Sequence, residues 1–298
     1  MRSSLKQIFF GKELSQEYIC VPRSLPNAPR LFLVGTEEQD ITKHHVLLGY
    51  KPLIFGSSLD LGAEMIQLEV RQEGAVLAKL GLNRIENTCG LFLYEGVSAK
   101  LNLSGKWRQF FLEQRERLKD KGPSNIDLSR SLFKQVVAAY CIPRSIPLMM
   151  VKKIGSVNIF PTDLHGGYGE NSYTSSLRID GKACAQLMEA EQILLCSMSL
   201  DRCKDVYNMG RNHMGEMRPI EEWPNLVETE FGTIPKGTIA LKELKIVDHK
   251  DMGIHRVFSY NVKKEKTLAH NEAELAHCHR EYIQWRLKNK FVSEYLLR

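Results

Sequence analysis

Eight short runs of β-type residues constrain the fold of this chain more than any other feature of its 298 residues. The runs are rich in valine, isoleucine, leucine and aromatic residues, and glycine, proline, asparagine or aspartate lie between them. They begin at residues 30, 65, 75, 89, 173, 192, 238 and 255. Because no long helices alternate with these runs, a doubly wound parallel sheet is disfavoured. We predict a mainly β chain with helices (α+β), folded as an antiparallel barrel or sandwich.

An internal repeat indicates that the chain contains two related copies of one fold. The heptapeptide CVPRSLP at 20–26 returns as CIPRSIP at 141–147. Downstream, a Gly-Tyr pair followed by Ser-Ser-Leu occurs within 49–59 and again within 167–177. Two matches in the same order and at nearly equal separation favour duplication over coincidence. We therefore predict a boundary near residue 125, with a degenerate, barrel-like or accessory domain over 1–125 and a second domain over 126–298.

Helices are expected around this boundary and at the end of the chain. Residues 104–122 read as a helix that begins at a serine N-cap, and a second helix is expected over 126–140. A short helix is expected over 181–191. After Asn271, apolar residues recur at intervals of three, four or seven, and Glu274 completes a capping box. This pattern predicts a long C-terminal helix whose apolar stripe packs in the core or in a dimer interface.

The composition excludes several classes of protein. The chain has 43% apolar and 26% charged residues, which is ordinary globular composition. No run approaches the roughly 18 apolar residues of a membrane span, and the amino terminus lacks the apolar stretch of a signal peptide. The net charge is +6, but no basic block interleaved with aromatic residues is present. We therefore predict a cytoplasmic protein that binds neither membranes nor nucleic acid.

The cysteines and the C-terminal histidines favour neither a disulfide framework nor a metal site. The seven cysteines are an odd number, are widely spaced and form no CxxC pair, so we expect reduced thiols. His270, His277 and His279 are close in sequence, but residues 277 and 279 would point apart on a helix. No spacing completes a tetrahedral site, and no metal is predicted.

The segment 157–196 gathers the residue types that a phosphate-bearing ligand requires. Hydroxyl, guanidinium and ammonium groups donate hydrogen bonds to phosphate oxygens, and the cations offset their charge. The same residue types are also typical of solvated loops and strand ends, so the pattern alone leaves both interpretations open. The candidate residues are Asn158, Thr162, Asp163, His165, Ser175, Ser176, Arg178 and Lys182.

Five motifs lie in an order that resembles the flavin reductase-like family. They are CIPRSIP, NIFPTDLHG, YTSSLR followed by GKA, VYNMGRNH and GIHRVFSYNV, within about 139–262. The resemblance implies an FMN-binding split β-barrel over 126–298, with FMN as cofactor and NADH or NADPH as co-substrate. It also implies a homodimer with the flavin near the subunit contact.

The family motifs imply roles for particular residues. His255 matches a Gly-Asp-His position near the nicotinamide and is the catalytic candidate, although Ile254 stands where the family has aspartate. The implied cofactor-binding residues beside the isoalloxazine ring are Asn158, Pro161 and Thr162, with Asp163 next to them. Those implied at the ribityl chain and phosphate are Ser175, Ser176, Arg178 and Lys182. Asn212 and His213 are implied near the cofactor or the dimer interface.

These residues predict an NAD(P)H-dependent FMN oxidoreductase that transfers hydride from NAD(P)H to flavin. Such chemistry needs orientation and electrostatic tuning from the protein rather than an acid and base, and no GxSxG, P-loop or GxGxxG motif is present. An FMN-binding electron carrier or binding module without nicotinamide turnover is the alternative, which Ile254 favours. A non-flavin binding or structural protein is the third. Because the first half lacks NIFPTDLHG, one flavin site per chain is predicted.

Overall fold

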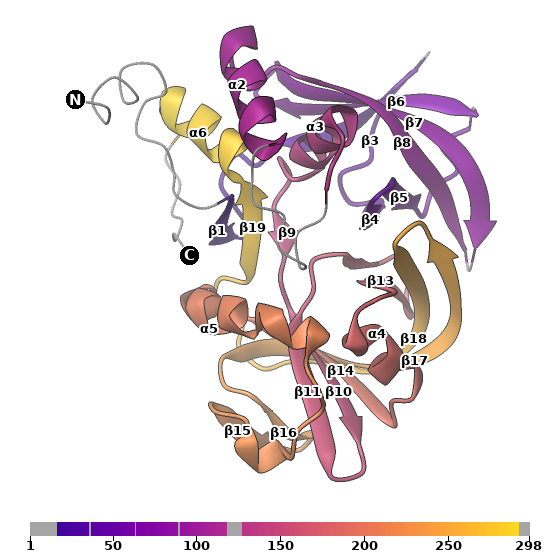
Figure 1. The fold of residues 1–298 in the computed structure, drawn as a ribbon, viewed down its shortest axis with the longest axis vertical. Helices are drawn as coiled ribbons and strands as arrows, with labels where there is room; N and C mark the ends of the chain where they lie inside the picture. Colours follow the sequence, from indigo (N-terminus) through magenta and orange to yellow (C-terminus); the bar gives the residue numbers. More distant parts are fainter. Residues whose placement is uncertain (1–16, 36, 63, 89, 118–126, 292–298) are drawn as a thin grey trace.

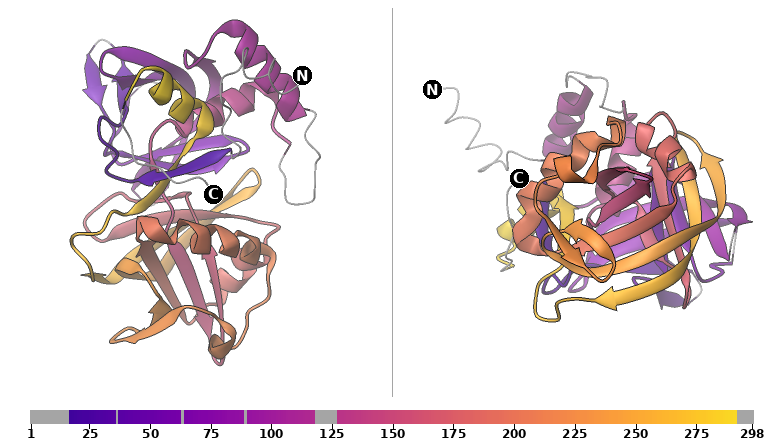
Figure 2. Two further views of the ribbon diagram at one scale, coloured as in Figure 1. Left: turned by 90° about the vertical axis from the view of Figure 1, so that its left-hand side faces the viewer. Right: turned by 90° about the horizontal axis from the view of Figure 1, so that it is seen from below.

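The chain folds into two lobes, each built on a seven-stranded antiparallel sheet (Figures 1 and 2). The computed structural model describes residues 17–35, 37–62, 64–88, 90–117 and 127–291. The sheet of the first lobe consists of β2 (Arg30–Val34), β3 (Glu38–Asp40), β4 (His45–Tyr50), β5 (Leu53–Ser57), β6 (Met65–Gln72), β7 (Ala75–Thr88) and β8 (Leu91–Leu101). The sheet of the second lobe consists of β10 (Leu148–Lys153), β11 (Ser156–Pro161), β12 (His165–Gly167), β13 (Ser172–Arg178), β14 (Gln192–Met198), β17 (Thr238–Met252) and β18 (His255–Thr267).

The two large sheets have the same strand order. The first runs β3-β2-β6-β7-β8-β5-β4 and the second runs β11-β10-β14-β17-β18-β13-β12. Counted along the chain within each sheet, these are identical permutations. In the described residues the two end strands of each sheet are not paired with each other, so both sheets are open.

A small third sheet joins the lobes, with β1 (Tyr18–Pro22) and β9 (Arg144–Ser145) on either side of β19 (Leu275–His279). The repeated heptapeptides therefore flank one central strand. A two-stranded sheet is formed by β15 (Leu226–Thr229) and β16 (Gly232–Pro235). The helices are α2 (Lys106–Arg117), α3 (Arg130–Ala139), α4 (Lys182–Met188), α5 (Cys203–Asn208) and α6 (Arg280–Lys288), with short 3₁₀ turns η1 (Leu200–Arg202), η2 (Met209–Met214) and η3 (Ile220–Glu222).

The sequence predictions of secondary structure are confirmed for the eight β-type runs, each of which lies in a strand. The expected helices at 104–122, 126–140 and 181–191 correspond to α2, α3 and α4, although residues 118–126 fall outside the described part of the chain. A mainly β fold with helices is therefore confirmed. No helix in the described ranges is long and apolar enough to cross a membrane.

The prediction of one long C-terminal helix from Asn271 is wrong. Residues 275–279 form β19, and among the described residues after Asn271 the helix covers 280–288, with His279 as the N-cap; residues 292–298 fall outside the described part of the chain. All five residues of β19 are buried, so both faces of this strand are covered, and strands pair with it on both edges. A strand without a solvent face lacks the alternation of apolar and polar residues that identifies a strand in sequence. The apolar residues of β19 and α6 together therefore show a helix-like spacing that the structure does not follow.

The prediction that the cysteines are reduced is also corrected. Cys20 of β1 and Cys203 of α5 form a disulfide across 183 residues of sequence. Both residues belong to the apolar cluster beneath α5, where the two elements meet. The other described cysteines, 141, 184, 196 and 278, are free and buried.

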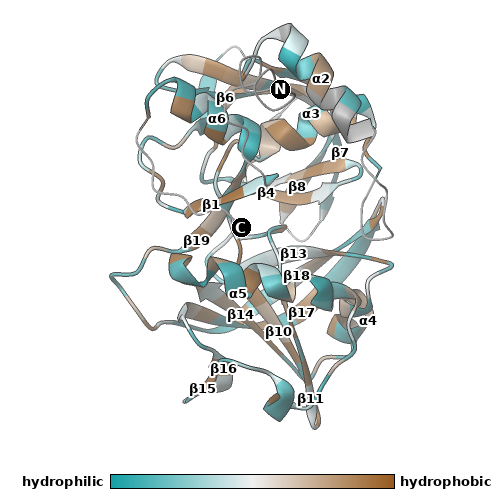
Figure 3. Ribbon diagram, turned by 60° about the vertical axis from the view of Figure 1, so that its left-hand side comes forward, coloured by the Kyte–Doolittle hydropathy of each residue, from teal (hydrophilic) through white to brown (hydrophobic). Residues whose placement is uncertain are grey.

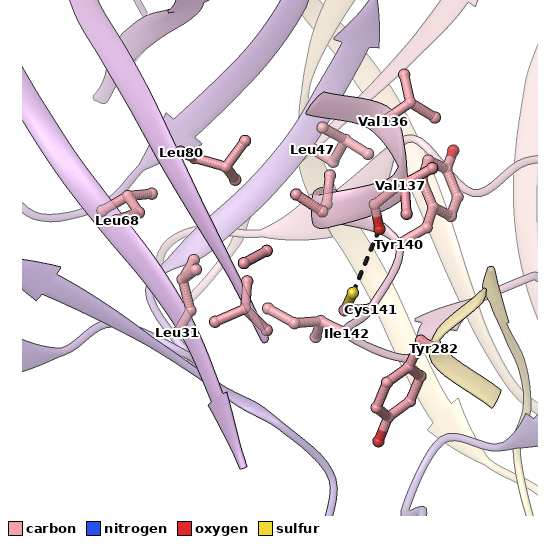
Figure 4. Packing of buried hydrophobic residues seen from close by; sticks show 14 of the residues in the cluster. Leu31, Leu47, Leu68, Leu80, Val136, Val137, Tyr140, Cys141, Ile142 and Tyr282 are labelled. Carbon is pink, nitrogen blue, oxygen red and sulfur yellow. Dashed lines mark hydrogen bonds between the residues drawn. The ribbon is translucent and has the colours of Figure 1, made fainter. Parts of the chain in front are cut away.

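The core of the first lobe is completed by segments from beyond residue 126. Val136 and Val137 of α3 pack with Leu47, Leu68 and other residues of the first sheet, as Figure 4 shows. Tyr282 and Ile283 of α6 belong to the same cluster. Each fully buried aliphatic side chain contributes about 1.5–3 kcal/mol, so α3 and α6 are held to this lobe by apolar burial. In Figure 3 much of α5 has the hydrophilic colour.

The two lobes meet through β4 and β12 and through the turns beside them. Val46 of β4 lies against Gly166 of β12, where an added Cβ would come within 2.7 Å of the valine Cγ2. Leu48, Met252 and Val257 belong to one buried apolar cluster that spans the contact. The lobes are therefore packed directly on each other.

Candidate functional site

A cavity of about 550 Å³ lies at the contact between the lobes, and we call it the Arg178 cavity. Its volume falls in the range of small-molecule sites. The second lobe supplies most of its wall from β13, β18 and η2, and the first lobe supplies Tyr50 at the end of β4. Six residues singled out in the sequence line this cavity: Thr162, Asp163, Ser176, Arg178, His213 and His255.

His255 is a buried histidine with no hydrogen-bond partner on either ring nitrogen among the described residues. It follows the turn at Gly253 and is only 1% exposed. The edge of the ring meets Tyr50, with the ring centroids 4.4 Å apart. Burial lowers the pKa of His255 to about 4, so the imidazole is neutral at pH 7. A neutral imidazole offers one donor and one acceptor, and leaving both unused costs about 1–3 kcal/mol each.

Two arginines make the Arg178 cavity cationic at one side. The guanidinium of Arg178, at the end of β13, donates from Nε to Asp180 Oδ1 at 2.9 Å. This hydrogen bond raises the pKa of Arg178, so the group stays charged. Arg211 of η2 also lines the wall and is exposed. An anion in the cavity would therefore meet one guanidinium shared with Asp180 and a second one from η2.

Asp163 forms a buried hydrogen-bonded chain with side chains from α3, α5 and β19. Its Oδ2 accepts from the Tyr140 hydroxyl at 2.8 Å and from His277 Nε2 at 3.0 Å. The other ring nitrogen of His277 lies 2.7 Å from the hydroxyl of Tyr207. Burial alone would raise the pKa of Asp163, but hydrogen bonds from His277 and Tyr140 hold it well below its usual range. The carboxylate is thus charged and fixed in position.

Ser176 connects the cavity wall to the first lobe. Its hydroxyl donates to the backbone carbonyl of Leu48 at 2.5 Å. Since Tyr50 covers His255 from the same strand, the first lobe shapes the cavity although it supplies few of the lining residues. Sequence analysis did not select Tyr50, yet the repeated Gly-Tyr pair contains it and was the signal that could have found it.

The amide side chains expected at a flavin ring lie behind the cavity wall and not in it. Asn158 Nδ2 donates to Gln186 Oε1 at 2.6 Å and to the carbonyl of Asn212 at 3.0 Å. Asn212 Nδ2 donates to the carbonyl of Ile159 at 2.8 Å. These bonds tie β11 to α4 and η2, so Asn158 and Asn212 position the elements that form the wall.

Three further predicted residues also bond outside the Arg178 cavity. The Ser175 hydroxyl lies 2.8 Å from the hydroxyl of Tyr260 inside the second lobe. Lys182 forms an ion pair with Glu216. Pro161 contributes its carbonyl, which accepts from His213 Nε2 at 2.7 Å and so orients a residue of the wall. Within the described ranges no group of three potential metal ligands is found.

Comparison with known proteins gives matches in structure only. No protein-family model and no curated protein sequence matches the chain. Among solved structures, an FMN-binding protein from Thermus thermophilus is 14% identical, with a TM-score of 0.40 over 54% of this chain and 95% of its own. An NADH:FAD oxidoreductase from Streptomyces globisporus is 11% identical, with a TM-score of 0.44 over 54% and 95%.

The flavin reductase component of a bacterial two-component tryptophan halogenase is 11% identical, with a TM-score of 0.43 over 55% of this chain and 97% of its own. These solved structures are flavin reductases and FMN-binding proteins, and the sequence motifs resemble a family of the same kind. At such identities and TM-scores, we base the functional proposal on the residues of the site.

Proposed function

We propose that the chain is a flavin-dependent oxidoreductase that holds FMN in the Arg178 cavity. The observation that carries the proposal is His255, a buried neutral imidazole that faces this cavity with both nitrogens unpartnered. A flavin ring edge bears carbonyl and N–H groups, one of which could pair with a ring nitrogen of His255. Arg178 and Arg211 supply the positive charge that a phosphate needs, and Leu164 and Leu177 supply apolar wall. The residues present therefore fit FMN.

The chain's own groups would bind and orient the cofactor. Bound flavin supplies hydride and electron transfer. Asp163 keeps a fixed negative charge beside the cavity, where it would accept a hydrogen bond from an N–H of a bound ligand. Tyr50 closes the side of the first lobe and keeps water from His255.

The binding proposal is tested by titrating the protein with FMN and following flavin fluorescence. Arg178→Gln should weaken FMN binding by about tenfold or more, since a hydrogen bond to a charged group contributes about 1.5–3 kcal/mol. Arg256→Gln is the matched control, because Arg256 also pairs with an aspartate through Nε and Nη2 but does not line the Arg178 cavity. Equal FMN affinity in the two variants would refute the assignment of Arg178.

A flavoprotein without nicotinamide turnover is the second candidate. Two observations favour it: His255 is 1% exposed beneath Tyr50, and the backbone N–H of Ile254 donates to the Lys51 carbonyl at 3.2 Å. The position expected to face a nicotinamide is thus covered by the first lobe. Anaerobic mixing of FMN-loaded protein with NADH or NADPH separates the two: bleaching of the flavin supports a reductase, whereas bleaching only by dithionite supports a carrier.

We further propose that the lobes are two related copies of a split barrel, divided near residue 125, with a single flavin site in the second copy. The shared strand order and the contact of Val46 with Gly166 support this. Val46 pairs with the residue before Ser57, and Gly166 pairs with the residue before Ser175, so the two occupy equivalent positions in their strand pairs. A homodimer remains a prediction, which sedimentation analysis of the full chain would test.

A further inference from the structure

A second cavity, of about 820 Å³, lies beside β9 and β12, and we call it the Arg144 cavity. Asp163 is the one lining residue that it shares with the Arg178 cavity. It holds Arg144 and Arg23, the arginines of the two repeated heptapeptides. The flavin proposal makes no use of this cavity.

Arg144 is a buried cation without a carboxylate partner. The residue is 8% exposed, and its Nη2 donates to the carbonyl of Ala139 at 3.2 Å. Its guanidinium also lies 6.0 Å from the ring centre of Phe55. Within the described residues, its Nε has no hydrogen-bond partner and no carboxylate forms an ion pair with it. A guanidinium stays charged in a protein, and here one hydrogen bond, the ring of Phe55 and the more distant charge of Asp163 offset only part of the cost of burying it.

Of the other charged residues that line the Arg144 cavity, Lys43 and Glu170 are exposed to solvent, and the rest are paired among the described residues. Arg23 pairs with Glu274 at 2.9 Å, and Lys242 pairs with Glu265. Asp163 is bound to Tyr140 and His277. Arg144 is therefore the cation in this wall that calls for an anion from outside the chain.

Two histidines in the wall are uncharged and do not add to this demand. His165 Nε2 lies 3.1 Å from the Ser145 carbonyl, and its Nδ1 lies 2.5 Å from the Tyr173 hydroxyl. Nδ1 of His45 lies 3.2 Å from the carbonyl of Ile41. Burial lowers the pKa of His165 to about 4 and that of His45 to about 3. Both rings are neutral at pH 7.

We infer that the Arg144 cavity binds a small molecule that carries one carboxylate on an apolar body. A planar carboxylate matches the fork of a guanidinium, and within the described residues Nη1 of Arg144 makes no hydrogen bond. Glu170 lines the same cavity without an ion-pair partner among the described residues and would disfavour a ligand with two or more negative charges. Leu195 and Val262 supply apolar surface for the body. The inference holds whether or not flavin binds in the Arg178 cavity.

The test is calorimetric titration of the wild-type full chain with benzoate and with benzamide. The two probes have nearly the same shape, but only benzoate carries the carboxylate. Benzoate should bind with a Kd of about 1 mM or below, and benzamide should bind at least about tenfold more weakly. Equal affinities, or no heat from benzoate at about 10 mM, would overturn the inference.

Two variants assign the recognition to Arg144. In Arg144→Met the preference for benzoate should disappear, and the thermal midpoint should stay the same or rise, because an unpaired buried charge is removed. Arg144→Lys keeps the positive charge but lacks the forked guanidinium, and it should lose about tenfold in benzoate affinity. This second variant tests the inference even if Arg144→Met does not fold. Arg218→Met is the control, since Arg218 stacks on Trp223 at 4.1 Å outside both cavities. Unchanged benzoate binding in the Arg144 variants would refute the site.

Discussion

Replacing Asp163 by asparagine tests whether the buried chain of Tyr140, Asp163 and His277 stabilises the fold through the charge of the carboxylate. In the wild type, Oδ2 accepts two hydrogen bonds, at 2.8 and 3.0 Å. Hydrogen bonds to a charged group contribute about 1.5–3 kcal/mol each, and asparagine keeps one neutral acceptor oxygen. The Asp163 side chain is 27% exposed, which moderates the loss. We expect Asp163→Asn to lower the free energy of unfolding by about 2–4 kcal/mol at pH 7.

The assay is urea unfolding followed by far-UV circular dichroism, repeated over a pH series. The folded-state pKa of Asp163 lies below the unfolded value of about 3.9, so its stabilisation is complete above that value and is lost as the pH falls toward the folded pKa. The difference between wild type and variant should therefore be constant from pH 7 to about pH 5 and shrink below about pH 4. Asp251→Asn, which breaks an exposed pair with Arg256, is the control and should cost about 1 kcal/mol or less.

Two results would refute this reasoning. If Asp163→Asn is as stable as wild type at pH 7, the carboxylate does not contribute as a charged acceptor. If its destabilisation is the same at pH 7 and at pH 3, the loss comes from packing and not from the charge of the carboxylate.

Two further predictions concern the contact between the lobes. Gly253→Ala should destabilise the protein by about 1–3 kcal/mol in urea unfolding, because φ is +60° and the added Cβ would come within 2.4 Å of the Lys51 carbonyl oxygen. Gly155→Ala has a similar φ of +71° but open space around it, so a loss as large in that variant would contradict the steric reason. His255→Phe should leave stability unchanged or raise it by about 1 kcal/mol, because two unused polar atoms are removed, and it should weaken FMN binding in the fluorescence titration. A large loss of stability in His255→Phe would mean that the imidazole has a structural partner.

Much of the fold could be predicted because most strands carry a local signal. Runs such as 192–198 combine β-branched or apolar residues with turn residues at both ends, and the structure places β14 over the same residues. Strands β17 and β18 extend further than their apolar runs. Residues 248–251 of β17 and 264–267 of β18 are exposed and mostly polar or charged, yet each segment pairs with the apolar run of the other strand. Local pattern cannot find such extensions, since pairing and not burial defines them.

The site was harder to predict than the fold, because its side chains come from positions far apart in the sequence. The family motifs led to Arg178 and His255, which meet at one cavity, but also to Asn158, whose side chain turns toward α4. A motif places a residue on a strand, whereas the cavity it faces depends on the neighbouring elements. Tyr50 and Arg144 reach their cavities only through the packing of one lobe on the other, for which the sequence holds no spacing signal beyond the internal repeat.

Comparison of equivalent positions in the two sheets explains why the second lobe supplies most of the Arg178 cavity. Through the register of β4 with β5 and of β12 with β13, Asp60 occupies the position equivalent to Arg178. Asp60 pairs with Arg84 at 3.1 Å and would repel a phosphate where Arg178 would attract one. The elements that form the outer wall of the Arg178 cavity also occur only in the second lobe among the described residues. There α4 follows β13, and residues 199–237, which include η2, separate β14 from β17. In the first lobe β6 turns directly into β7. Exchanging Asp60 for arginine would therefore not create a second site, because the walls that enclose a ligand come from segments that the first lobe does not have at these positions.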